Sequence, residues 1–149
     1  MRLTLYTDYA LRLLLTLAAP GVGRTTISEV ALGYGIARNH LTKVAYELGT
    51  LGLIKTSRGK GGGLALARPA ESINLGAIVR ATEGDFALVP CKSRGIGACR
   101  IFPACRLHHA LEQATEAFLA VLDGYTLADL ADGDIAPLLW PNMAVPGTG

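Results

Sequence analysis

Apolar positions recur at three- and four-residue steps along much of the chain, which is typical of helices that bury one face. Short stretches rich in glycine and polar residues interrupt this pattern and mark where the helical segments end. The pattern predicts helices at approximately residues 4–19, 26–34, 37–51, 72–84 and 105–125. The chain is therefore expected to be mainly α-helical.

The second and third predicted helices are separated by only a tight corner. Thr26 and Glu29 have the spacing of a capping box, which starts the second helix. Gly35 lies at the corner, where a sharp turn requires a residue that tolerates a positive φ angle. Ala31 is small where two crossing helices come close, and Ile36 is apolar. Any helical hairpin gives similar spacing, but this combination favours a DNA-binding helix-turn-helix.

A β-hairpin is predicted directly after the third helix. Two short β-like runs, "LIKTS" and "GLALA", flank the basic, glycine-rich sequence "RGKGGG". In this order the hairpin is a wing, and the outer face of the third helix and the wing tip suit base edges and phosphates of DNA. A solvated helix face and an ordinary glycine-rich loop are the alternatives. The candidate DNA-binding residues are Arg38, Asn39, His40, Thr42, Lys43, Arg58, Gly59 and Lys60.

The last long segment is strongly amphipathic. Its apolar stripe consists of Leu107, Leu111, Ala114, Phe118, Val121 and Leu122. One use of this stripe is to pack on the helix's own domain, but a small winged domain has little apolar surface left to cover the helix. We therefore expect it to pair with a second copy, because two-fold symmetry also matches a palindromic operator.

The expected fold is thus a winged helix-turn-helix with a small β-hairpin wing and a long C-terminal dimerisation helix. The helix expected within 72–84 should bury Ile73, Ala77, Ile78 and Ala81. The expected organisation is a DNA-binding domain at 1–70, a connecting helix and linker at 71–90, a cysteine loop at 91–105, a dimerisation helix and its end at 106–139, and a disordered tail at 140–149.

Charge is distributed unevenly along the 149 residues. Residues 1–68 carry nine Lys and Arg against three acids, a net charge of +6, whereas residues 69–149 carry five bases against nine acids, a net charge of −4. The basic first half predicts a polyanionic partner, unless the asymmetry is chance. The longest early apolar run is interrupted by Arg12 and is too short to span a bilayer. No signal-peptide pattern is evident, so we expect a cytoplasmic protein without a membrane partner.

All three cysteines lie within fifteen residues, as Cys91, Cys99 and Cys105. In a reducing compartment a disulfide is not expected, and it would leave one thiol unpaired. Zinc prefers four ligands, often in closely spaced pairs, and neither gap here has that spacing. The wide gaps favour an iron–sulfur cluster with one position left for a non-thiolate ligand. Zinc held by three cysteines and a histidine, a thiol redox switch, and three buried free cysteines are the alternatives.

No catalytic constellation is recognisable in the sequence. There is no Ser-His-Asp set and no carboxylate pair at enzyme-like spacing, and "GKGGG" lacks the Lys-Ser/Thr ending of a phosphate-binding loop. The protein is therefore predicted not to be an enzyme.

The motifs taken together resemble one family. The segments "MRLTLYTDYALRLL", "RNHLTKV", "RGKGGGLALARPA", "INLGAIVRATEG", "ACRL" and "LDGYTLADL" are similar to the Rrf2 family of bacterial winged-helix iron–sulfur regulators, from Met1 to about Leu139. The resemblance implies a homodimer with crossed long helices and one cluster per subunit. Its nitric-oxide-sensing branch is most similar, and its iron-responsive and cluster-homeostasis branches are the others to consider.

The resemblance also implies a ligand set for the cluster. In the nitric-oxide-sensing branch, three cysteines and an aspartate from the partner's first helix hold a [4Fe–4S] cluster, which corresponds here to Cys91, Cys99, Cys105 and Asp8 of the partner subunit. In the cluster-homeostasis branch, a histidine three residues after the last cysteine, here His108, completes a [2Fe–2S] site. We favour the aspartate. The first cysteine gap is wider than is common in the family and resembles the iron-responsive branch.

The expected function follows from this resemblance. The protein is expected to be a homodimeric repressor that binds double-stranded operator DNA and releases it when nitric oxide, its effector, reacts with the cluster. The alternatives are a regulator that responds to iron or cluster status, and a DNA-binding protein switched by zinc or thiol oxidation.

Overall fold

The computed structural model describes residues 2–59, 61–89, 99, 101–131 and 135–139. Its helices are α1 (Leu5–Ala18), α2 (Ile27–Tyr34), α3 (Arg38–Thr50), α4 (Leu75–Thr82), α6 (Arg106–Asp123), α7 (Leu127–Leu130) and α8 (Ile135–Leu139). Short 3₁₀ turns are η1 (Ala70–Ser72) and η2 (Phe102–Ala104), and the strands are β1 (Ile54–Ser57) and β2 (Gly63–Leu66). The prediction of a mainly helical winged fold is confirmed. The expected tail at 140–149 lies outside the described residues.

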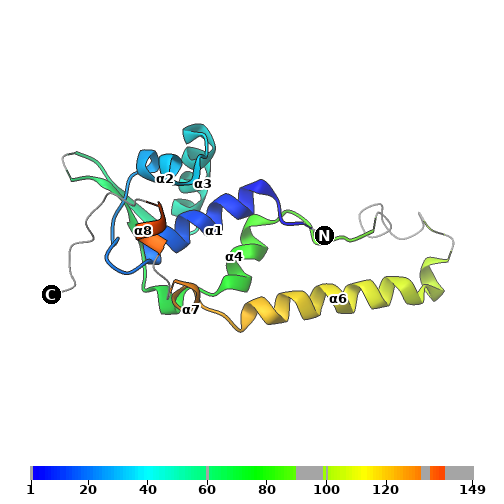
Figure 1. Ribbon diagram of the computed structural model, residues 1–149. Coiled ribbons are helices and arrows are strands. Elements are labelled where there is room, and N and C mark those ends of the chain that lie inside the picture. The colour runs from blue at the N-terminus through cyan, green and yellow to red at the C-terminus, as the bar shows by residue number, and fades with distance from the viewer. Residues whose placement is uncertain (1, 60, 90–98, 100, 132–134, 140–149) are drawn as a thin grey trace.

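The winged head is built around α1. Figure 1 shows α1 running through the middle of the head, with α2, α3 and the hairpin on one side and α4 and α7 on the other. Each fully buried aliphatic side chain stabilises such a core by about 1.5–3 kcal/mol. The largest fully buried side chains come from α1, α2, α3, α4, α7 and the segment before α4, and they include Leu13, Leu14, Val30, Leu41, Leu48, Ile73, Ile78 and Leu127.

The predicted helix-turn-helix is present. The Glu29 amide donates to the Thr26 hydroxyl over 3.2 Å, and the Thr26 amide donates to the Glu29 carboxylate over 2.6 Å, which completes the capping box. The backbone hydrogen bond from Thr26 is the main cause that lowers the pKa of Glu29. Gly35 ends α2 with a φ of 65°, in the left-handed region. The chain then turns directly into α3, and Ile36 becomes part of the core.

The wing is a short antiparallel hairpin in which Ile54 pairs with Leu66 and Ser57 with Gly63. The guanidinium of Arg24, before α2, donates to the Ser57 hydroxyl over 2.7 Å and to the Gly61 carbonyl over 3.0 Å. Arg24 therefore anchors the hairpin to the rest of the head. A side chain at Gly62 would overlap the Ser57 carbonyl oxygen, so the tight turn requires glycine there.

The inward face of α4 differs from the prediction. Ala77 and Ala81 are exposed, so their expected burial is wrong. The Asn74 side chain caps the helix by accepting a hydrogen bond from the Ala77 amide. With the helix starting at this cap, the residues that face α1 and α6 are Leu75, Ile78 and Val79, while Ile73 is buried just before them.

A set of polar contacts fastens the C-terminal end of α6 to α4. The Arg80 guanidinium donates to both carboxylate oxygens of Asp123, at 2.7 Å for the Nη2–Oδ2 pair, and the Asn74 side-chain amide donates to the Asp123 carbonyl over 2.8 Å. The Leu75 amide donates to the Tyr125 carbonyl over 2.9 Å. We call Asn74, Arg80 and Asp123 the α4–α6 clamp. It fixes the direction in which α6 leaves the head.

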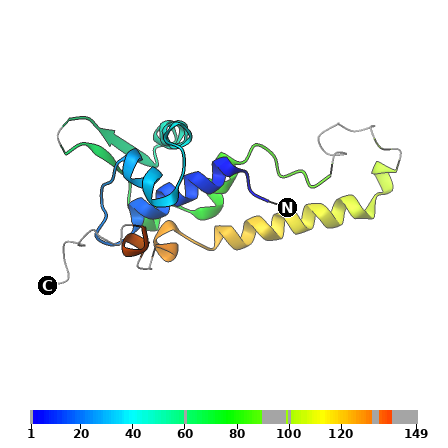
Figure 2. The same cartoon turned by 45° about the horizontal axis from the view of Figure 1, so that its top comes forward.

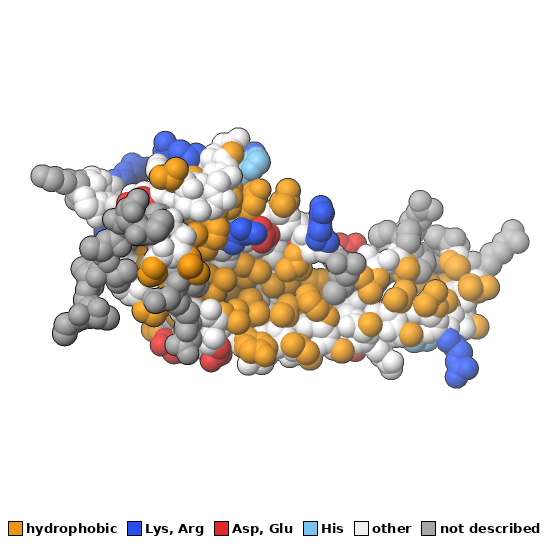
Figure 3. All heavy atoms as spheres, viewed as in Figure 1, with side chains coloured by type: hydrophobic (Ala, Val, Ile, Leu, Met, Phe, Trp, Pro, Cys, Tyr) orange, Lys and Arg blue, Asp and Glu red, His pale blue; other side chains and the backbone are white. Residues whose placement is uncertain are grey.

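The predicted long helix α6 projects from the head as an arm, in the direction opposite to the wing (Figures 1 and 2). Among the described α6 side chains only His108 is buried, while Leu107 and Val121 are 64% and 63% exposed. Figure 3 shows apolar side chains gathered along this arm. The head therefore covers only part of the apolar stripe of α6 and leaves much of it exposed. No helix among the described residues is long and apolar enough to cross a membrane.

Candidate nucleic-acid interface and cysteine site

The predicted DNA-reading residues of α3 lie on its outer face. The inner face of this helix is formed by Leu41, Val44, Ala45 and Leu48, which are buried. The helical period then directs the remaining side chains of its N-terminal half outward. All five candidates are exposed, namely Arg38, Asn39, His40, Thr42 and Lys43.

The wing carries the second group of candidates. Arg58 and Gly59 are exposed at the far end of β1, and Gly59 has a φ of 92°, which favours glycine. Lys60 lies outside the described residues. Exposed basic groups on both α3 and the hairpin suit the contacts that winged helices make with a duplex and its backbone.

Two contacts connect the start of α1 to α3. The Tyr6 hydroxyl donates to the Glu47 carboxylate over 2.7 Å, and burial together with this hydrogen bond raises the pKa of Tyr6. The Tyr9 and His40 rings stack with their centroids 6.0 Å apart. These two contacts join the start of α1 to the side of α3 that carries His40.

Two of the three cysteines are described, and they flank the turn η2 at the N-terminal end of α6. The Phe102 amide donates to the Cys99 carbonyl over 3.1 Å, and the Cys105 amide donates to the Phe102 carbonyl over 3.3 Å. Both thiols are free and half-buried. Cys105 directly precedes α6, whose unpaired amides and positive dipole end favour a negative charge. These features fit thiolate ligands of an iron–sulfur cluster. Cys91 lies outside the described residues.

Asp8 occupies the first turn of α1, within the head. Its carboxylate makes a two-pronged ion pair with the Arg12 side chain, at 2.9 and 3.0 Å, and its side chain is 39% exposed. The helix α1 lies in the head, whereas the start of α6, which directly follows Cys105, lies at the far end of the arm (Figures 1 and 2). No cluster of three or more His, Cys, Asp or Glu is found within the described part of the chain.

His108, the alternative ligand, lies one turn into α6 and is only 8% exposed. Its ring centroid is 4.7 Å from that of Phe102, and its Nε2 is 3.3 Å from the Glu112 carboxylate. The segment before the cysteine loop covers it, because Phe86 and Val89 line the same small cavity. His108 is therefore both close in sequence to Cys105 and engaged in packing of the arm.

Sequence reasoning missed other residues of these surfaces. Arg24 and Tyr46 were not considered, although Arg24 anchors the wing and Tyr46 is 77% exposed on α3. The signal for Tyr46 was its position four residues after Thr42, on the same helical face. For Arg24, which contacts residues more than thirty positions away, the sequence held no local signal.

Comparison with known proteins assigns the family. The family model "Rrf2", described as an iron-dependent transcriptional regulator, matches residues 3–133. The chain is 49% identical over 142 residues to the HTH-type transcriptional regulator NsrR of Bacillus subtilis, covering 93% of this chain and 97% of that protein. It is 50% identical over 131 residues to NsrR of Halalkalibacterium halodurans, covering 87% and 90%. These are names of transcriptional regulators, a non-enzymatic role, as predicted.

Solved structures agree with this assignment. The oxidized form of Staphylococcus aureus CymR is similar with a TM-score of 0.69 and 28% identity, covering 89% of this chain and 98% of that chain. The T. potens protein IscR is similar with a TM-score of 0.68 and 25% identity, covering 97% and 93%. On the match over residues 3–133 and these relatives, the chain belongs to the Rrf2 family of DNA-binding transcriptional regulators.

Proposed function

We propose that the chain is a homodimeric repressor that carries an iron–sulfur cluster and releases its operator in response to nitric oxide. The observation that carries this proposal is the 49% identity to NsrR, which extends over 93% of the chain and includes the cysteine segment. The free, half-buried thiols at the start of α6 support a cluster at this position. The exposed basic face of α3 supports operator binding.

We assign the cluster as [4Fe–4S], with Cys91, Cys99, Cys105 and Asp8 of the partner subunit as ligands. When bound, the cluster supplies iron that reacts with nitric oxide. The three cysteine thiolates would hold it, and the positive N-terminal end of α6 would favour its negative charge. The separation of α1 from the cysteine end of the arm in one subunit supports a ligand that comes from the second subunit (Figure 1).

The path from the cysteines to DNA follows two connections. The first is α6 itself, which begins at Cys105 and ends in the α4–α6 clamp at the head. The second is α1, where Asp8 lies between Tyr6 and Tyr9, and these contact Glu47 and His40 of α3. A bound cluster would join the ends of both connections at the cysteine site, and half-site spacing would make operator binding sensitive to a shift of the two heads once α6 and α1 are no longer held there.

A second candidate function is a regulator that responds to iron or cluster status, like RirA or IscR. Two observations favour it, the structural similarity to T. potens IscR and the position of His108 one turn after Cys105. In that case His108 is the fourth ligand and the cluster is [2Fe–2S]. A DNA-binding protein switched by zinc or by thiol oxidation is the remaining alternative.

Substituting the two candidate ligands separates these functions. Asp8→Ala is expected to leave the dimer folded, because the partly exposed Asp8–Arg12 pair contributes only about 0.3–0.5 kcal/mol. It should nevertheless change the visible absorption and slow or alter the response to nitric oxide. His108→Ala is the comparison. Unchanged spectra in Asp8→Ala, together with loss of the cluster in His108→Ala, would assign the fourth ligand to the histidine.

Salt-dependent binding tests the DNA interface. Arg58→Ala should weaken binding to all duplexes alike and reduce the slope of log affinity against log salt concentration by about 1, because one phosphate contact is lost. Arg38→Ala should instead change which operator sequence is preferred, since on this proposal its exposed side chain reaches base edges in the major groove. Fluorescence anisotropy at several salt concentrations measures both effects. If neither variant changes affinity or preference, DNA binds elsewhere.

A further inference from the structure

One large side chain on the outer face of α3 is not among the residues predicted to bind DNA. Tyr46 is 77% exposed, which leaves most of an aromatic ring in water. It follows Arg38 by eight residues and Thr42 by four, so these three side chains form one row along the helix. This row includes Arg38 and Thr42, two of the five residues on α3 that were predicted to read DNA.

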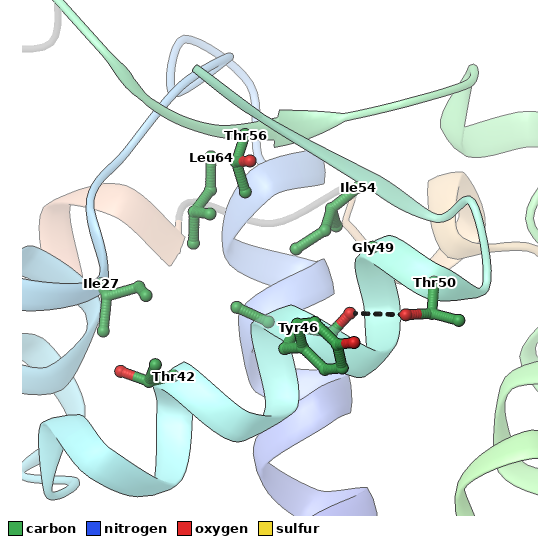
Figure 4. A pocket seen from close by; sticks show the side chains of 9 residues that line it. Ile27, Thr42, Tyr46, Gly49, Thr50, Ile54, Thr56 and Leu64 are labelled. Carbon is green, nitrogen blue, oxygen red and sulfur yellow. Dashed lines mark hydrogen bonds between the residues drawn. The ribbon is translucent and has the colours of Figure 1, made fainter. Parts of the chain in front are cut away.

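Tyr46 borders an open groove between α3 and the wing. The groove has a volume of about 530 Å³. Figure 4 shows α3 on one side of it, carrying Thr42, Tyr46 and Thr50, and the strand residues Ile54 and Thr56 on the other. The described residues that line the groove are all uncharged. They are Ile27, Thr42, Ala45, Tyr46, Gly49, Thr50, Ile54, Thr56 and Leu64.

The two elements that flank this groove both carry exposed basic side chains. Arg38 and Lys43 are exposed on α3, and Arg58 is exposed just after strand β1, whose Ile54 and Thr56 line the groove. A duplex that contacts both groups through its phosphates must pass over the groove between them. The part of DNA that then faces Tyr46 consists of deoxyribose and base edges, whose apolar surfaces are the sugar carbons and the thymine C5-methyl groups.

We propose that Tyr46 is a DNA-contacting residue whose ring packs against this apolar surface of the duplex and so contributes to operator affinity. The inference rests on operator binding through α3 and the wing, and it adds an aromatic contact to that interface. Thymine methyl groups and deoxyribose both present apolar carbon atoms against which the ring can pack. Removing only the methyl group from the DNA distinguishes the two.

The test uses full-length protein purified without oxygen, with iron content matched among variants, and a duplex that wild-type protein selects from a random-sequence pool. Tyr46→Ala is expected to lower affinity for this duplex about tenfold, whereas Tyr46→Phe, which keeps the ring, should stay close to wild type. Alanine is a strong helix former and the ring is exposed, so α3 should remain intact. Tyr125→Ala, which removes a half-exposed tyrosine outside α3, is the matched control.

Replacing single thymines by deoxyuridine identifies the surface. If the deoxyuridine duplex binds wild-type protein more weakly but binds Tyr46→Ala no more weakly than the thymine duplex does, the contact is to a thymine methyl group. If wild-type protein binds both duplexes with equal affinity, the contact is to deoxyribose. Wild-type affinity in Tyr46→Ala overturns the inference, as does a loss in Tyr46→Phe equal to that in Tyr46→Ala. If wild-type protein selects no duplex, operator binding itself fails and the inference fails with it.

Discussion

Replacing Cys105 with serine is expected to give a folded protein that retains no stable cluster and no longer responds to nitric oxide. Cys105 occupies the residue directly before α6, and its amide is held by the Phe102 carbonyl. Serine is a favourable residue at a helix start, so α6 keeps its N-terminal end. A serine hydroxyl is a far weaker iron ligand than a thiolate, because it is not deprotonated near neutral pH. Only the ligand is lost.

Iron and sulfide content after anaerobic reconstitution, together with visible absorption, measures this effect. Ala104→Ser is the matched control, since it places the same hydroxyl on the neighbouring exposed residue without removing a thiol. It should keep a full cluster. Wild-type iron content and an unchanged nitric-oxide response in Cys105→Ser would exclude Cys105 as a ligand, and with it the cluster site at the start of α6.

Introducing a charge on the apolar stripe of the arm is expected to have the second large effect. Val121 is 63% exposed in one subunit, so Val121→Asp should leave the head folded. In a paired arm the same carboxylate is buried without a partner, which costs several kcal/mol and should give monomers. A monomer binds only one half-site, and losing the second linked contact lowers operator affinity by about a hundredfold or more.

Analytical ultracentrifugation and operator binding measure the two consequences together. Gln113→Asp adds the same charge to an exposed residue outside the apolar stripe, and it should remain dimeric. A Val121→Asp protein that is still dimeric, or a monomer that binds the operator as tightly as wild type, would contradict dimerisation through α6.

Local signals in the sequence were sufficient to predict the main elements of the head. The capping box at Thr26, the left-handed Gly35 and the glycine-rich hairpin are each determined by residues within a few positions, and all three are present. The prediction for the buried face of α4 was confirmed for Ile73 and Ile78 and wrong for Ala77 and Ala81, because the start of the helix is set by the Asn74 cap and its packing by distant helices.

The remaining features depend on residues far apart in the chain. The Arg80–Asp123 ion pair joins residues separated by forty-three positions, and no local pattern indicates it. Tyr46 was not predicted for a different reason. Apolar periodicity predicts which positions are buried and charge predicts which surfaces bind DNA, whereas an exposed aromatic side chain gives neither signal. The proposed fourth ligand, Asp8 of the partner subunit, is a similar case, because a ligand from a second subunit would leave no spacing signal within one chain.

The most direct test of the account follows the cluster and DNA binding in one sample. Anaerobically purified protein is titrated with nitric oxide in the presence of operator DNA, while absorption, native mass spectra and bound DNA are recorded. The account predicts an iron–sulfur cluster in each subunit of a dimer, and operator release in proportion to the loss of cluster absorption. Protein that is colourless and iron-free even after reconstitution, yet binds its operator and releases it on nitric oxide addition, would contradict it.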